Sequence, residues 1–173
     1  GVVDALLIEP LGYREGGRLV RLYEYRVAEP GRWGTISAPN FMDWLASSET
    51  LGAGALYDES SPTLRLGDRS IKLQAAWVNA SYFDVLGVEP SLGRFFLPEE
   101  DEPGSSRAVL SWELWREVFD GDPGVLGRTL DLDGFPYTVV GVAGRFEDPG
   151  LSGATFGTPR LWRSTPRYFV TNS

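Results

Sequence analysis

Two dipeptides that favour tight turns, Gly67-Asp68 and Asp133-Gly134, each lie between short segments with the composition of β-strands. The flanking segments are residues 53–66 and 70–78 for the first turn, and residues 129–132 and 137–142 for the second. Strands joined by a two-residue turn pair antiparallel, because a parallel pair needs a long crossover connection. The two hairpins therefore favour a mainly antiparallel sheet over a doubly wound parallel one.

Short helices are expected between the strands. Ser37 is placed to cap a helix whose first turn contains Pro39 and which runs to Gly52. Ser111 is placed to cap another, which ends at Gly121 and Pro123. The other expected elements are a strand over residues 18–26, a short helix over residues 80–86 stopped by Gly87, a strand at Val109-Leu110, and loops over residues 144–158. Together these elements predict an α+β fold of mixed, mainly antiparallel strands and short helices.

The composition excludes several classes of protein. A chain of 173 residues, 42% hydrophobic and 13% aromatic, is large enough for one packed domain or two small lobes. A net charge of −8 would repel phosphate backbones, so nucleic acid is not expected as a partner.

The residues of the common enzyme mechanisms are missing. The sequence has neither cysteine nor histidine, which removes thiolate nucleophiles, Ser-His-Asp triads and the usual zinc ligands. No phosphate-binding glycine motif occurs, so this segment is not expected to bind ATP. We therefore expect no catalytic residue and no cofactor. A hydrolase built on two carboxylates stays open, and it would need a cleft that holds two acids with perturbed pKa values.

An acidic run, Glu99, Glu100, Asp101 and Glu102, lies between two prolines. Its carboxylates are of the kind that bind Ca²⁺, but consecutive carboxylates converge only in a tight loop, and charge runs are usually solvated. We expect an acidic surface loop and no metal site, and cation binding by this loop stays open.

Five of the six tryptophans divide into two groups by their surroundings. Trp44, Trp112 and Trp115 lie at helical spacing and are expected in the core. Trp33 and Trp162 lie in segments flanked by Gly and Arg, which predicts loops. There each ring either folds back onto the core or is exposed, and if exposed these two are the candidates for contact with a partner.

A series of apolar and glycine motifs follows one order along the chain. The motifs are Pro-Asn-Phe-x-x-Trp from Pro39 to Trp44, Tyr82-Phe83 with Leu86-Gly87-Val88, Leu92-Gly93-Arg94-Phe95-Phe96, Val109-Leu110-Ser111, Leu114-Trp115, Phe119, Gly127 and Val139-Val140-Gly141-Val142. None is diagnostic alone. Their order resembles that of the periplasmic core domain of MacB-like ABC-transporter permeases, the FtsX/MacB type. Residues 5–13 also resemble the end of the first transmembrane helix in this family, especially in its duplicated-permease kind.

The resemblance implies a mechanical function without catalysis. In that family the domain stands outside the inner membrane, between the first and second transmembrane helices, and has an α/β porter-like lobe and a β-rich lobe called Sabre. ATP hydrolysis by a cytoplasmic ABC ATPase moves these lobes through the membrane helices. The implied partners are the protein's own transmembrane helices, that ATPase, a second copy in a homodimer or pseudo-dimer, and a periplasmic protein or a substrate.

The resemblance also implies boundaries. Residues 17–90 would form the porter-like lobe and residues 91–165 the Sabre-like lobe of one extracytoplasmic domain, truncated at its C-terminal end. Residues 1–8 would be the tip of a removed transmembrane helix. The alternative is a free-standing secreted module that binds a peptide, lipid or sugar.

Overall fold

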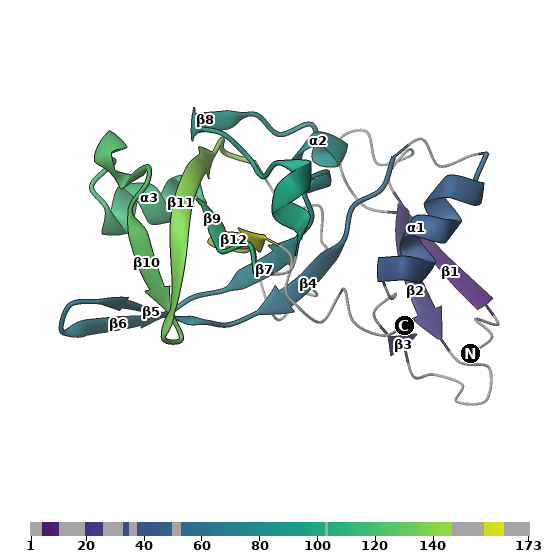
Figure 1. Cartoon of the computed structure of the whole chain (residues 1–173), viewed down its shortest axis with the longest axis horizontal. Coiled ribbons are helices and arrows are strands. Elements are labelled where there is room, and N and C mark those ends of the chain that lie inside the picture. Colours follow the sequence, from purple (N-terminus) through teal and green to yellow (C-terminus); the bar gives the residue numbers. More distant parts are fainter. Residues whose placement is uncertain are drawn as a thin grey trace.

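The computed structural model describes residues 5–10, 20–25, 33–34, 38–49, 53–102, 104–146 and 158–164. Up to residue 49, side chains are described only for Phe41 and residues 43–49. Short helices and many short strands alternate (Figure 1), which confirms the predicted α+β class. Among the described strands, only the β9–β11 and β7–β12 pairs are parallel, so the pairing is mainly antiparallel as predicted.

A small sheet contains the first three strands. β1 (Ala5–Pro10), β2 (Val20–Tyr25) and β3 (Trp33–Gly34) pair antiparallel in that order, and α1 (Ala38–Ser47) follows. The strand expected over residues 18–26 is confirmed over residues 20–25, and the helix expected after Ser37 is confirmed, but it ends at Ser47 and not at Gly52. Residues 5–8 were expected in the tip of a helix, but they form part of β1, because β2 offers them a full antiparallel partner from Ala5↔Tyr25 to Pro10↔Val20.

A nine-stranded sheet contains the rest of the strands. They are β4 (Tyr57–Ser60), β5 (Thr63–Leu66), β6 (Arg69–Lys72), β7 (Ala75–Val78), β8 (Pro90–Gly93), β9 (Arg107–Leu110), β10 (Thr129–Leu132), β11 (Phe135–Ala143) and β12 (Leu161–Ser164). Their order is β4-β7-β12-β9-β11-β10-β5-β6, with β8 paired to β11. α2 (Tyr82–Leu86), α3 (Trp112–Val118) and the 3₁₀ turns η1 (Pro98–Asp101) and η2 (Pro123–Val125) lie between them.

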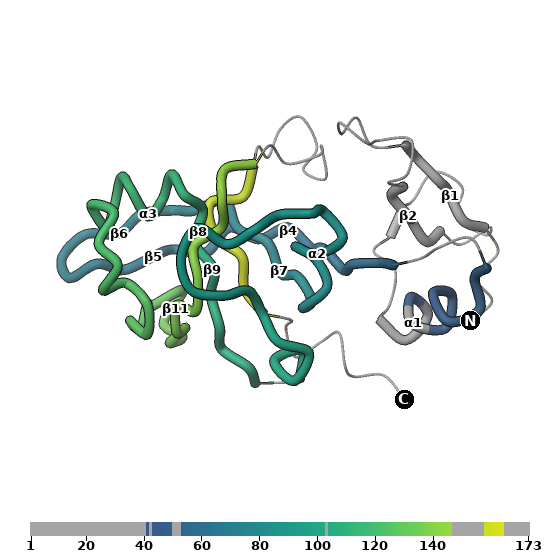
Figure 2. The backbone as a smooth tube through the Cα atoms, turned by 90° about the horizontal axis from the view of Figure 1, so that it is seen from above, coloured from purple at the N-terminus to yellow at the C-terminus, as the bar shows by residue number. Residues whose placement is uncertain are grey.

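β4 to β7 form one long hairpin that curls the sheet. Every pair across it, from Tyr57↔Val78 to Leu66↔Arg69, keeps the same register, although two residues on each arm separate its base, β4–β7, from its tip, β5–β6. The base pairs with β12 and the tip pairs with β10. Because both ends of the strand order thus belong to one hairpin, the sheet closes into a ring (Figures 1 and 2).

The turn of the second hairpin also helps to close this ring. Asp133 and Gly134 both have positive φ, 55° and 85°, as a two-residue turn of type I′ requires. The Asp133 carboxylate accepts a hydrogen bond of 2.9 Å from the Thr63 backbone N–H, and the Asp133 N–H donates one of 3.0 Å to the Thr63 carbonyl. The predicted turn therefore joins the β10–β11 hairpin to the start of β5.

Alternate residues of the strands pack on opposite faces of the sheet. On one face, Ala75, Leu110 and Leu161 belong to the larger core cluster, together with Leu114 and Phe119 at the two ends of α3. On the other face, the neighbouring residues of the same strands pack against α2 and Phe96; they are Ala76, Val109 and Trp162. Strands in the middle of this sheet are thus covered on both sides.

Two helix ends follow the predicted signals. α2 ends at Gly87, which has φ of 66° and left-handed geometry. α3 begins after Ser111, whose hydroxyl accepts a hydrogen bond of 3.0 Å from the Leu114 N–H. Three tryptophans expected in the core are only half-buried, Trp112 and Trp115 on α3 and Trp44 on α1, whereas Leu114 and Phe119 supply the buried contacts of α3.

The division between lobes expected at residue 90 does not follow the sheets. The strands from β4 to β7 pair with β10 and β12, so they belong to the same sheet as residues 90–164. The boundary between the two sheets lies between α1 and β4.

Candidate functional site

Glu100 lies where three segments of the chain meet. η1 turns its side chain inward, and the carboxylate is 10% exposed. The two guanidinium nitrogens of Arg94 donate to its two oxygens at 2.8 Å each, Arg107 Nε donates at 3.0 Å, and the Leu97 backbone N–H donates at 3.0 Å. Arg94 follows β8 and Arg107 begins β9. One carboxylate thus connects η1 to two strands.

Two glycines place Arg94 in this cluster. β11 bulges at Val140, and the Arg94 N–H donates to the Val140 carbonyl at 3.0 Å. A Cβ at Gly141 would overlap the Arg94 carbonyl oxygen, and a Cβ at Gly93 would overlap the Val140 carbonyl oxygen. Gly93 also has φ of 68°, which L side chains rarely adopt. The close approach of β8 and β11 at this bulge therefore requires glycine in both strands.

The donors around Glu100 change its protonation. Hydrogen bonds from the Arg94 guanidinium, aided by those from Leu97 and Arg107, lower the pKa of Glu100 from 4.5 to about 2 against the opposing effect of burial. The same contact raises the pKa of Arg94. The cluster therefore stays fully ionised at neutral pH. An acid this strongly stabilised as its anion is poorly suited to give or take protons near neutral pH, so the geometry indicates a structural ion pair.

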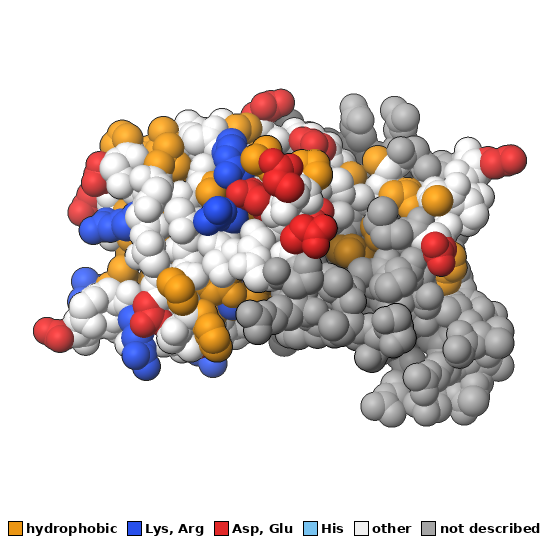
Figure 3. Space-filling model, viewed as in Figure 1, with side chains coloured by type: hydrophobic (Ala, Val, Ile, Leu, Met, Phe, Trp, Pro, Cys, Tyr) orange, Lys and Arg blue, Asp and Glu red, His pale blue; other side chains and the backbone are white. Residues whose placement is uncertain are grey.

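The four carboxylates of the acidic run separate in the structure. Glu100 faces the two arginines, and Asp101 accepts a hydrogen bond of 2.8 Å from the Ala80 N–H. Glu99 and Glu102 are exposed (acidic side chains are red in Figure 3). Within the part of the chain that the structure describes, no group of three or more metal-ligating side chains gathers at one point. The arrangement supports the expected surface loop, with one inward carboxylate that the sequence pattern did not distinguish.

Trp162 was a candidate for partner contact only if its ring was exposed, and it is buried. It lies in β12 and not in a loop, and only 1% of it is exposed. Its ring packs edge-on against Phe83 at 5.3 Å and stacks with Phe146 at 5.5 Å between centroids. β12 is central because β7 and β9 pair with it on either side, so the Trp162 ring is core.

Trp33 lies in β3 and not in a loop, paired with Tyr25 of β2. Its side chain lies outside the described part of the structure, so its role in partner contact stays a prediction.

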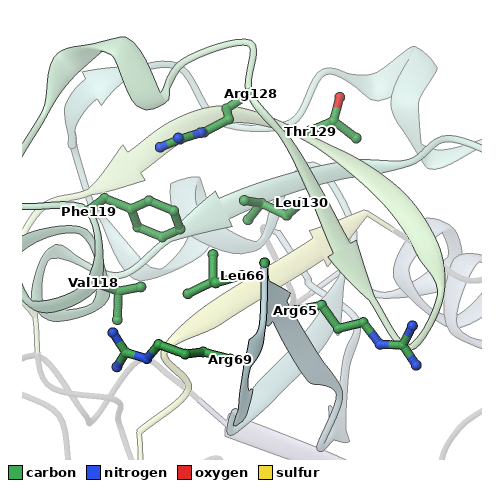
Figure 4. Close-up of a pocket in the computed structure, with 9 residues that line it drawn as sticks. Arg65, Leu66, Arg69, Val118, Phe119, Arg128, Thr129 and Leu130 are labelled. Carbon is green, nitrogen blue, oxygen red and sulfur yellow. The ribbon is translucent and has the colours of Figure 1, made fainter.

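A pocket opens beside the tip of the β5–β6 hairpin (Figure 4). Its volume is about 400 Å³. Apolar side chains from three elements form its floor, and three arginines stand around it; the apolar residues are Leu66, Val118, Phe119 and Leu130, and the arginines are Arg65, Arg69 and Arg128. No short motif marks this pocket, because Arg128 is 59 positions from Arg69 and the two are brought to one place by the pairing of β5 with β10.

Within the described residues, no helix is both long and apolar enough to span a bilayer. α1, the longest α-helix described, has 10 residues, where a span needs about 20.

Two solved structures share this fold. The extracellular domain of the noncanonic ABC-type transporter YknZ from Gram-positive bacteria is similar with a TM-score of 0.58 and 19% identity, over 79% of this chain and 65% of that one. The periplasmic region of MacB from Actinobacillus actinomycetemcomitans is similar with a TM-score of 0.56 and 21% identity, over 79% of this chain and 56% of that one.

Sequence comparison agrees with the fold. The macrolide export ATP-binding/permease protein MacB of Burkholderia thailandensis is 28% identical over 102 residues, which are 58% of this chain and 16% of that protein. The chain thus spans only a small part of that relative. The profile of the family described as MacB-like periplasmic core domain matches residues 8–172, nearly the whole chain. The chain therefore belongs to the family of MacB-like periplasmic core domains found in ABC-type transporter permeases.

Proposed function

We propose that this domain transmits ATP-driven conformational change on the extracytoplasmic side of the plasma membrane. The ATPase would be a separate cytoplasmic domain or subunit, coupled through transmembrane helices of the same permease. Two copies of the permease, or its two halves, would act together, and the moving domain would contact a substrate or a periplasmic protein. Family membership over residues 8–172 is the observation that carries this proposal.

The closed ring supports such a role, because transmitted motion needs a body that moves without deforming. The ring has few ways to deform, since the β4–β7 hairpin holds both ends of its strand order. β1, β2 and β3 form a separate sheet, with no strand of the ring paired to them among the described residues. We assign the three-stranded sheet to the porter-like lobe and the ring to the Sabre-like lobe, and movement would occur between them.

Spin labels in the full-length permease test this movement. The 173-residue chain contains no cysteine, so single cysteines can be introduced at chosen places. The measuring pair is Asp43→Cys on α1 with Asp84→Cys on α2, both at exposed positions. We expect the distance distribution between the labels, measured by double electron–electron resonance, to shift between the nucleotide-free and the ATP-bound permease.

The matched control pair lies within one body. Asp84→Cys with Phe135→Cys places both labels on the nine-stranded unit, and Phe135 is 67% exposed. Its distance should stay constant when ATP binds. A measuring pair as constant as the control would contradict transmission through this domain, and a shift in the control pair would contradict the rigid ring.

A further inference from the structure

The arginines beside the hairpin tip differ in the face of the sheet from which they project. In β5 and β6, Leu66 and Arg69 are directly opposite each other, so both lie on the face of Leu64 and Ile71, which pack in the larger core cluster. Arg65 has the opposite parity, and its partner across the β5–β10 ladder is Asp131. Arg69 thus projects from a core-facing position, whereas Arg65 stands on the other face opposite an acid.

Arg128, just before β10, also projects from a core-facing position, as Arg69 does. It precedes Thr129 and has the parity of Leu130 and Leu132, which are 3% and 0% exposed. Its guanidinium carbon lies 5.8 Å from the centre of the Phe119 ring. In Figure 4 the side chains of Arg69 and Arg128 extend along opposite sides of Val118 and Phe119, while that of Arg65 points away from them.

Among the described residues, no carboxylate forms an ion pair with either of these two arginines. Arg94, Arg107, Arg145 and Arg160, by contrast, each pair with a glutamate. The chain has 24 acids against 16 basic residues, so two unpaired cations beside one apolar floor run against its overall charge. A guanidinium group offers a planar array of donors that suits an anionic head group with two or more oxygens.

The floor between the arginines is apolar and well packed. Phe119 is 5% exposed and Leu130 is 3% exposed, so both are core side chains with little surface for a ligand, and the apolar surface open to it belongs to the half-buried Leu66 and Val118. The pocket volume of about 400 Å³ falls in the range of roughly 300–1,000 Å³ in which proteins bind small molecules. A ligand that fits would present an apolar body to this floor and an anionic head to the arginines.

We infer that the pocket at the β5–β6 hairpin tip binds a small organic anion, with its carboxylate or sulfonate head held by the exposed side chains of Arg69 and Arg128 and its apolar body on the half-buried Leu66 and Val118. The inference does not depend on the proposed movement of the domain. It adds to the ring a ligand site at the end remote from α1 (Figures 1 and 2).

A pair of fluorescent probes separates charge from apolar contact. 8-Anilinonaphthalene-1-sulfonate carries an anionic head on an aromatic body, and N-phenyl-1-naphthylamine has the same body without the charge. With the full 173-residue chain, we expect the sulfonate to bind at least 10-fold more tightly than the uncharged probe, because charged hydrogen bonds contribute most of the difference. Equal affinities for the two probes would overturn the anionic head site.

Three substitutions test which arginines bind the anionic head group. Arg69→Gln and Arg128→Gln should each weaken binding of the sulfonate about 10-fold, because each removes one charged donor group. Arg65→Gln removes the same charge from the other face of β5, where the side chain points away from Val118 and Phe119 (Figure 4), so it should change the affinity by less than about 2-fold, as expected for a charge separated from the ligand by water. Equal weakening by all three variants would show a general charge effect and overturn the inference.

Amide chemical shifts locate the probe. On addition of the sulfonate, the shifted amides should cluster at Leu66, Arg69, Phe119 and Arg128. Melting temperatures that match the unsubstituted chain would show that the variants keep their fold. Shifts that cluster elsewhere, or an affinity unchanged in a folded Arg69→Gln, Arg128→Gln double variant, would overturn the assignment.

Discussion

At the scale of single residues, Glu100 is the central group of an ion-pair cluster. Four donors surround a carboxylate that is 10% exposed. Removing the charge leaves two arginines without their acceptor, which is costly because both arginines still have to be placed beside one another. The ion pair matters less for its attraction than for holding η1 against β8 and β9.

Glu100→Gln is expected to lower the free energy of unfolding at neutral pH by about 2 kcal/mol, the usual size for hydrogen bonds to a charged group. The folded pKa is about 2, below the ordinary 4.5, so this stabilisation is fully present above about pH 5 and is lost as the pH falls through about 2. Urea denaturation of both proteins between pH 7 and pH 2.5 measures the difference.

The control is Glu102→Gln, an exposed carboxylate in the same loop. It should match the unsubstituted chain within about 0.5 kcal/mol, as surface substitutions usually do. If the difference caused by Glu100→Gln were the same at every pH, ionisation of Glu100 would not be the source of the stabilisation.

At the scale of elements, the Asp133-Gly134 turn joins two hairpins that are distant in sequence. Asp133→Ala should destabilise the fold by about 2 kcal/mol, because alanine at φ of 55° is strained by about 1 kcal/mol and the hydrogen bond to the Thr63 N–H is lost. Asp133→Asn keeps an oxygen acceptor and tolerates this backbone conformation. Thermal unfolding of the two variants should therefore differ clearly, and equal losses would mean that the turn does not hold β5.

Elements with a local signal could be predicted from the sequence. The turn dipeptides, Gly87 at the end of α2 and Ser111 before α3 each act within a few residues, so their effect is visible in the sequence itself. β12 was not predicted, because the short run Leu161–Ser164 becomes a strand only between β7 and β9. Tertiary pairing decided its conformation and with it the burial of Trp162.

The candidate sites could not be predicted from the sequence either, because they too depend on tertiary contacts. Glu100 was indistinguishable from its acidic neighbours, because its arginine partners are six and seven residues away and meet it only through the pairing of β8 and β9 with β11. Arg69 and Arg128 are 59 positions apart in the sequence and lie at one pocket because β5 pairs with β10. Contacts of this kind depend on the closed sheet, and no short motif encodes them.

At the scale of the whole molecule, the ring divides the strands into interior and edge positions. β9 has a partner on both sides, β11 and β12, whereas β6 pairs with β5 alone among the strands that the structure describes. In native-state hydrogen exchange, the amides of β9 should exchange only through global unfolding, with the free energy found by denaturation. Those of β6 should exchange faster by local opening. Equal protection of β6 and β9 would contradict this order of stability.

The constant register of the β4–β7 hairpin also restricts how the length of this chain can change. Residues 61–62 on one arm and 73–74 on the other separate the base from the tip, and the Leu73 N–H donates to the Pro62 carbonyl at 2.9 Å between them. A single insertion or deletion on one arm would turn every side chain beyond it to the opposite face. Since the base is held by β12 and the tip by β10, neither end is free to slip, and the hairpin tolerates a change in length only when both arms gain or lose residues together.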